Sequence, residues 1–163
     1  MQNEKNTRRV EELFEMMIEE NVPQDVFTFN TLMNAYGTNS TKAEEVMTRM
    51  RKAEVKPDIF TYTTLMNAYG TNHIEAEKVL KRMKIDKVTP NDRTYNTLMN
   101  AYGTNHIEAE KVLKRMKIDK LIPNVTTYTT KNTASNQSIS APQIRITDEG
   151  FRRNSVQRLF AGS

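Results

Sequence analysis

Cysteine and tryptophan are absent from this chain of 163 residues, and glycine and proline occur only five times each. Without cysteine there are no disulfides, thiolate nucleophiles, iron–sulfur ligands or cysteine-based zinc sites. No apolar run approaches the roughly 20 residues that span a bilayer, so we expect no membrane association. A glycine-rich phosphate loop and a grouping of nucleophile with base are missing as well. We therefore expect a protein without catalytic activity, cofactor or metal site.

Charge is distributed unevenly along the sequence, although the formal net charge is only +4. Residues 1–25 hold three basic and seven acidic side chains, a net of −4, whereas residues 26–124 hold sixteen and eleven, and residues 125–163 hold five and two. The early glutamates argue against a secretory or organelle-targeting peptide. The basic remainder is compatible with a polyanionic partner.

An internal repeat with a period of 33 residues organises the chain. The segment TLMNAYGTNHIEAEKVLKRMKIDK occurs at 64–87 and again, unchanged, at 97–120, and its first nine residues also occur at 31–39. Such a period is typical of a solenoid. We predict three whole units at 26–58, 59–91 and 92–124, preceded at 1–25 by an acidic segment that holds the second helix of a partial unit. An interrupted fourth unit is expected at 125–130, followed at 131–163 by a polar, disordered, basic tail.

Each unit is predicted to form two helices. In the unit 59–91, apolar residues recur at helical spacing in two stretches, first Tyr62, Leu65, Met66 and Tyr69, and then Ala76, Val79, Leu80 and Met83. Between them, Gly70 suits the end of a helix, and Asn72 stands three residues before Glu75 with the spacing of a capping box. Neither helix is apolar enough to be stable alone, so units must stack. The fold class is therefore predicted to be all-α, an α-solenoid of stacked helix-turn-helix repeats.

These units resemble pentatricopeptide repeats. Over residues 10–130 they repeat Thr-aromatic-Asn/Thr-Thr-Leu, then Ala-Glu-x-Val/Leu, then Met, then Pro-Asp/Asn. The rival tetratricopeptide repeat needs tryptophan and a Leu-Gly pair, and both are missing. The units are slightly shorter than is usual for the family, at the turn between the helices.

The resemblance implies recognition of single-stranded RNA with one base per unit. In the family, one reading residue follows the Thr-aromatic pair and the other is the last residue of the unit. Carried over to this sequence, the reading pairs are Asn30 with Asp58, Thr63 with Asn91, and Asn96 with Asn124. The family rules then suggest an RNA core of 5′-U-A-C/U-3′. Thr129 begins a purine site whose second residue cannot be identified in the tail, and Asp25 is the last residue of the partial unit.

A further set of positions is where the family places side chains between successive bases, and here it holds Phe27, Phe60 and Arg93. The units 59–91 and 92–124 differ at five positions. One difference, Thr63/Asn96, falls on a predicted reading position, and a second, Phe60/Arg93, falls on a position between successive bases. Other interpretations fit the same residues: the phenylalanines also suit packing between units, and Asn or Thr also favours the first turn of a helix. The basic residues of the second helices are interpreted as a solvated outer face.

Zinc chemistry is not expected from this sequence. His73 and His106 stand one whole unit apart, which does not suit a shared metal site. Some members of the family carry a C-terminal deaminase domain, but its zinc site requires cysteines.

We therefore predict non-catalytic, sequence-selective binding of single-stranded RNA, with other RNA-processing proteins as further partners and a mitochondrial or chloroplast location by resemblance alone. Two alternatives are a helical-repeat scaffold that binds a protein or peptide, and a truncated fragment with little function of its own.

Overall fold

A computed structural model describes residues 2–103 and 105–134, and every element in this part of the chain is an α-helix. The helices are α1 (Gln2–Glu19), α2 (Val26–Ala35), α3 (Ser40–Lys52), α4 (Ile59–Ala68), α5 (His73–Ile85), α6 (Asp92–Ala101), α7 (His106–Ile118) and α8 (Val125–Ala134). They alternate between a first helix of ten residues and a second helix of thirteen from α2 to α7.

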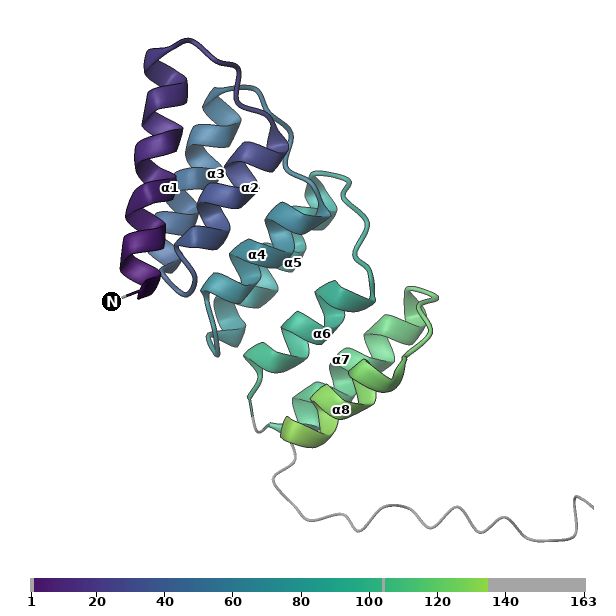
Figure 1. Ribbon diagram of the computed structural model, residues 1–163. Coiled ribbons are helices and arrows are strands. Elements are labelled where there is room, and N and C mark those ends of the chain that lie inside the picture. Colours follow the sequence, from purple (N-terminus) through teal and green to yellow (C-terminus); the bar gives the residue numbers. More distant parts are fainter. Residues whose placement is uncertain (1, 104, 135–163) are drawn as a thin grey trace, which may run out of the picture.

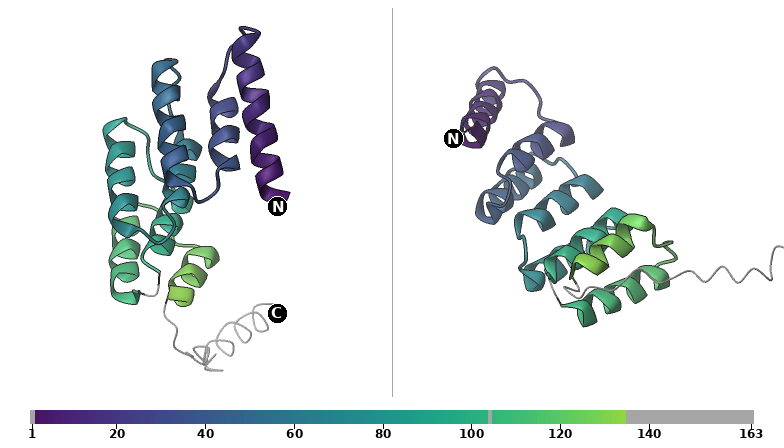
Figure 2. Two further views of the ribbon diagram at one scale, coloured as in Figure 1. Left: turned by 90° about the vertical axis from the view of Figure 1, so that its left-hand side faces the viewer. Right: turned by 60° about the horizontal axis from the view of Figure 1, so that its bottom comes forward.

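The helices stack in two layers along one direction, with α1 at one end and α8 at the other (Figures 1 and 2). The first helices α2, α4, α6 and α8 pack successively against one another, and α3, α5 and α7 form the other layer. This arrangement confirms the predicted all-α solenoid.

The turn between the helices of a unit repeats almost unchanged. The glycine in this turn adopts a left-handed conformation, with φ of +56° at Gly70, and nothing lies within 4 Å of an added Cβ there. Asn72 then caps α5 by accepting a hydrogen bond from the Glu75 backbone at 3.3 Å, as predicted. The reciprocal bond of a capping box is not formed there, because the Glu75 carboxylate pairs with Lys78 at 2.6 Å instead.

The core lies between the two layers and consists of the predicted apolar stripes. Within the unit 59–91, the stripe residues Tyr62, Leu65, Met66, Ala76, Val79, Leu80 and Met83 are all buried. The methionines at Met50, Met83 and Met116, which recur every 33 residues, have no exposed surface. Unbranched methionine fills the irregular space between stacked helices.

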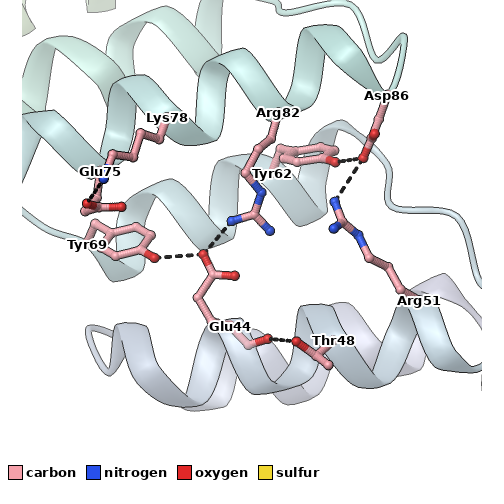
Figure 3. Close-up of polar contacts among 9 residues, drawn as sticks. All are labelled: Glu44, Thr48, Arg51, Tyr62, Tyr69, Glu75, Lys78, Arg82 and Asp86. Atoms are coloured by element: carbon pink, nitrogen blue, oxygen red, sulfur yellow. Dashed lines mark hydrogen bonds and ion pairs between the residues drawn. The ribbon is translucent and has the colours of Figure 1, made fainter.

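Half-buried ion pairs join neighbouring units at the second layer (Figure 3). The Glu44 carboxylate on α3 accepts hydrogen bonds from the Tyr69 hydroxyl at 2.7 Å and from the Arg82 guanidinium on α5 at 2.6 Å. One unit later, Glu77 is contacted in the same way by Tyr102 and Arg115. The second helices thus carry basic side chains that bind the preceding unit, so the interpretation of all of them as a solvated outer face is wrong.

A second polar cluster joins the same layer at the ends of the second helices. Asp86, after α5, accepts hydrogen bonds from the Tyr62 hydroxyl and from Arg51 on α3, the latter at 3.2 Å (Figure 3). Asp119 accepts from Tyr95 and from Lys84, the latter at 3.0 Å. We call each such set of a tyrosine, a carboxylate and a basic residue a tyrosine–carboxylate–cation triad.

The sequence predicted that the repeat breaks off after residue 130 and that a disordered tail begins at residue 131. Helix α8 instead extends to Ala134, so the first four residues of the predicted tail are helical. The rest of the predicted tail, 135–163, lies outside the described residues. Within residues 2–103 and 105–134, no helix has the length and apolar character needed to cross a membrane.

Candidate nucleic-acid interface

The predicted reading residues gather where consecutive first helices meet. The first residue of each pair lies on a first helix and the second caps the first helix that follows, so each predicted pair spans two first helices although both residues belong to one unit. Between α2 and α4, a pocket of about 410 Å³ is lined by the first predicted pair and by both phenylalanines predicted to stack on bases, namely Asn30, Asp58, Phe27 and Phe60. Thus residues far apart in the sequence form one concave site.

Asn30 and Asp58 are directly bonded in this pocket. The Asn30 amide donates to Asp58 Oδ1 at 3.2 Å, and its oxygen lies 2.7 Å from the Thr61 hydroxyl. The same Asp58 oxygen accepts from the Thr61 backbone and hydroxyl, each at 2.8 Å, and thereby caps α4. Three donors on one oxygen and a bonded amide hold both reading side chains in fixed orientations.

Asp58 is held in its charged form by this network. Burial by itself raises the pKa of the carboxyl, but the hydrogen bonds from Thr61 and Asn30 outweigh burial, so the pKa lies below its ordinary value. The bonds from Thr61 and Asn30 all go to Asp58 Oδ1, and the Asn30 amide uses one of its two N–H groups in them. The pair therefore presents one acceptor and one donor side by side, which suits the edge of a base.

The second pair, Thr63 and Asn91, is arranged more loosely. Thr63 is buried, and its hydroxyl donates to the Ile59 carbonyl at 2.6 Å within α4. Asn91 caps α6 by accepting from the Thr94 backbone at 3.0 Å. Among the described residues, no hydrogen bond joins Thr63 to Asn91. The threonine side chain is shorter than the asparagine at the same position of the first pair.

The third pair, Asn96 and Asn124, differs again. The Asn96 side chain is 9% exposed, and among the described residues its oxygen has no hydrogen-bond partner. Asn124 donates its amide to Asp92 at 2.9 Å, so Asp92 holds the second reading residue of this pair. Sequence reasoning did not assign a role to Asp92, although Ile59/Asp92 is one of the five differences between the two nearly identical units.

The residues predicted to stack are exposed to different degrees. Phe27 is 74% exposed, which does not suit an ordinary core residue, whereas Phe60 is 38% exposed. The Arg93 guanidinium lies over the Phe60 ring, 5.2 Å from its centroid, in a cation–π contact. Thr129, predicted to begin a further site, is exposed on α8 and donates to the Val125 carbonyl at 2.9 Å.

Sequence reasoning missed that the second reading residues are also helix caps. Asp25, Asp58 and Asn91 each accept a backbone hydrogen bond from the threonine three positions later, and Asn124 accepts the same bond from Thr127. The signal was present in the sequence, because an Asp or Asn stands three residues before a threonine in every unit. Capping fixes the position of each reading side chain relative to its helix.

Comparison with known proteins agrees with this geometry. Residues 25–71 match the PPR repeat family, and residues 1–39 and 71–105 match the pentatricopeptide repeat domain. No curated protein matches the chain.

Several solved structures are similar to this chain. One is the crystal structure of the pentatricopeptide repeat protein PPR10 in complex with an 18-nt psaJ RNA element, with a TM-score of 0.74 and 27% identity over 79% of this chain and 20% of that chain. Another is PPR10 from maize, with a TM-score of 0.66 and 29% identity over 74% of this chain and 18% of that chain. The present chain thus spans about a fifth of the length of PPR10.

The PPR domain of Arabidopsis thaliana protein-only RNase P 1 in complex with tRNA shares the fold, with a TM-score of 0.66 and 16% identity over 82% of this chain and 74% of that chain. The repeated sequence, the stacked helix pairs and the matches to family and structure agree with one another. The chain belongs to the pentatricopeptide repeat family.

Proposed function

We propose that this chain binds single-stranded RNA and reads one base at each junction between first helices, without catalysing a reaction. The observation that carries the proposal is the pocket between α2 and α4, which is lined by Asn30 and Asp58 together with Phe27 and Phe60. A base has two π-faces and a polar edge, and this pocket offers aromatic rings and a donor–acceptor pair. The RNA complexes of PPR10 and of the RNase P domain support this choice of ligand.

The base preferences follow from the three pairs. By the family rules, the bonded Asn30–Asp58 pair is assigned to U, the Thr63–Asn91 pair with its shorter side chain to A, and the Asn96–Asn124 pair to C or U. A well-placed bidentate contact to a base discriminates by about 1–3 kcal/mol. Three such sites select about one sequence in 64, four to the third power, so the chain favours a short motif rather than one transcript. The family resemblance extends the proposal to transcripts of mitochondria or chloroplasts.

The test exchanges one reading residue and varies one base. Short RNAs that contain U-N-C, with each base at N, are titrated against the chain and its Thr63→Asn variant by fluorescence anisotropy. We expect the preference at N to move from A toward a pyrimidine, because the longer amide fills the space beside Asn91. The control is Thr71→Asn, the same exchange at an exposed position in the turn between α4 and α5.

Three results would count against the proposal. If Thr63→Asn and Thr71→Asn give the same base preference as the unchanged chain, Thr63 does not read a base. If affinity is independent of salt, phosphate contacts do not contribute to binding. If no single-stranded RNA binds even at low salt, a protein-binding scaffold becomes the better function.

A further inference from the structure

Helix α8 is a first helix whose second helix is not present among the described residues. It packs against α6 and α7, and Asn124 caps it as Asn91 caps α6. Its tyrosine is unlike those before it, because Tyr128 is 47% exposed whereas Tyr62 and Tyr95 are fully buried. The following sequence does not repeat the apolar stripe of a second helix. The residues in register with Ala109, Val112, Leu113 and Met116 are Pro142, Arg145, Ile146 and Glu149.

Helix α1 has the complementary property. Val10, Leu13, Phe14 and Met17 are in register with the stripe Ala43, Val46, Met47 and Met50 of α3. Leu13 is 45% exposed, whereas Val46 is 1% exposed, because α3 lies between the first helices α2 and α4 while α1 has a first helix, α2, on one side only and otherwise contacts Arg49 of α3 in the described part of the chain. An apolar pocket of about 220 Å³ remains between α1 and α2. Its lining is mostly apolar, which suits the packing of a further first helix.

The tyrosine–carboxylate–cation triad indicates which helix fits α8. The triad is complete at Tyr62, Asp86 and Arg51, and again at Tyr95, Asp119 and Lys84. In the first unit the same three positions hold Phe29, Ala53 and Ile18, so the polar set is replaced as a whole by apolar residues.

At α8, the positions equivalent to Tyr95 and Lys84 of the triad hold Tyr128 and Lys117. A complete triad at this place therefore requires a carboxylate at the position equivalent to Asp119. The residue of the tail in register with Asp119 is Arg152, which has the wrong charge, whereas Glu20, which directly follows α1, occupies that register at the other end of the chain. Glu20 and Lys117 are both exposed. The charge of residues 1–25, a net of −4, agrees with docking against the basic end of the solenoid.

We propose that α8 of one copy and α1 of a second copy pair as the two helices of one composite repeat, which joins copies head to tail. Glu20 of the second copy then completes the triad with Tyr128 and Lys117, and the stripe of α1 is covered by α8. Lys131 and Asn132 replace the Leu98 and Met99 of α6 on α8, so this junction is weaker than those within the chain and forms reversibly. The contact joins two different surfaces, so an assembly of any length keeps an unpaired α1 at one end and an unpaired α8 at the other.

The composite repeat also completes a reading pair, a consequence that rests on the proposed function. Thr129 occupies the position of Asn30, Thr63 and Asn96, and Asp25 occupies the position of Asp58, Asn91 and Asn124. Asp25 already has the local geometry of Asp58, because its carboxylate accepts from the Thr28 backbone at 2.8 Å and from the Thr28 hydroxyl at 2.7 Å. Thr129 of one copy and Asp25 of the next therefore form a site for a purine. Two joined copies read U-A-C, then the purine, then U-A-C.

The junction is tested without RNA, by light scattering on the full chain over a range of concentrations. The weight-average mass should rise above the 18.9 kDa of one copy as concentration increases. Glu20→Lys and Lys117→Glu should each stay near one copy, because each places like charges at the junction. An equimolar mixture of the two variants should associate again, since every junction between unlike copies then pairs opposite charges.

The matched control is Glu19→Lys, which makes the same charge change at an exposed neighbour outside the triad register. It should associate like the unchanged chain. Circular dichroism of each variant should be unchanged, because the exchanged residues are exposed. The proposal is overturned if the unchanged chain stays at one copy at all concentrations, if Glu19→Lys and Glu20→Lys behave alike, or if the mixture fails to associate.

RNA of the form U-A-C-N-U-A-C then tests the shared reading pair. The unchanged chain should prefer a purine at N, and Glu20→Lys should lose this preference while it keeps its preferences within each U-A-C. Association with equal affinity for all four bases at N overturns the shared pair. Association together with no binding of any RNA overturns the proposed function but not the junction.

Discussion

The contacts of Glu44 provide a measure of how strongly the polar network couples neighbouring units. Glu44→Ala removes the bonds to Arg82 at 2.6 Å and to Tyr69 at 2.7 Å (Figure 3). A hydrogen bond to a charged group contributes about 1.5–3 kcal/mol, whereas exposed ion pairs contribute about 0.2–1 kcal/mol. The Glu44 and Arg82 side chains are 32% and 30% exposed, so their contribution falls between these limits. We expect Glu44→Ala to lower the free energy of unfolding by about 1–3 kcal/mol.

The measurement is urea unfolding followed by circular dichroism, analysed with a nearest-neighbour description because repeat units couple mainly to their neighbours. Glu45→Ala is the control, since it removes only an exposed pair with Lys42 on the same helix and should cost about 0.3–0.5 kcal/mol. Glu77→Ala repeats the experiment one unit later, where Tyr102 and Arg115 make the same contacts, and should give a similar loss.

A double-mutant cycle isolates the pair itself. Glu44→Ala and Arg82→Ala should show a coupling of about 1 kcal/mol, because the two residues are in direct contact. The explanation is refuted if this coupling is no larger than the error of the measurement, or if Glu44→Ala costs no more than Glu45→Ala. Either result would mean that apolar packing alone joins the units.

Two further predictions concern the turn and the effect of pH. Gly70→Ala should destabilise the chain by about 1–2 kcal/mol, because alanine is strained at a left-handed φ. No neighbour lies within 4 Å of the added Cβ, so the whole cost should be conformational. A much larger loss of stability in urea unfolding would contradict this explanation. Burial, and then hydrogen bonds to Glu44 and Glu77, raise the pKa of Tyr69 and of Tyr102 to about 12 from the ordinary value of 10.0. Because these pKa values are raised in the folded chain, the two tyrosines contribute their full stability below pH 10, and this contribution should disappear between about pH 10 and 12. In thermal unfolding, Tyr69→Phe should therefore lose less stability over this pH range than the unchanged chain does.

The repeat period was sufficient to predict most of the fold. Once Tyr62, Leu65 and Met66 were placed on one helix and Val79 and Leu80 on another, stacking was the only way to bury both stripes. The cap at Asn72 was predictable for a related reason, because it depends on residues three positions apart.

Contacts between units could not be predicted in this way. Arg82 and Glu44 are 38 residues apart, so their pairing depends on how the second helices are offset after stacking. Periodicity fixes which residues are equivalent but not which residues of successive units touch. For this reason Arg82 and Arg115 were placed on a solvated face.

The candidate site was predicted in position more fully than in detail. Family register named Asn30 and Asp58 as a pair, and the structure places Asn30 on α2 and Asp58 at the cap of α4, where their side chains are bonded. The hydrogen bond from Asn124 to Asp92 and the unpartnered oxygen of Asn96 depend on side-chain orientations. The repeat register predicts equivalent positions but not these orientations. The assignment of these residues as base readers remains a prediction.

The two layers differ in mechanical stiffness because they are joined differently. Backbones of successive first helices approach closely, whereas α3, α5 and α7 make no such approach to one another in the described part of the chain and are bridged by long side chains. Bending that opens or closes the outer edge therefore changes chiefly the distances spanned by these side chains, while the spacing between first helices stays nearly constant. If the chain binds RNA as proposed, its reading sites keep their interval when the solenoid bends.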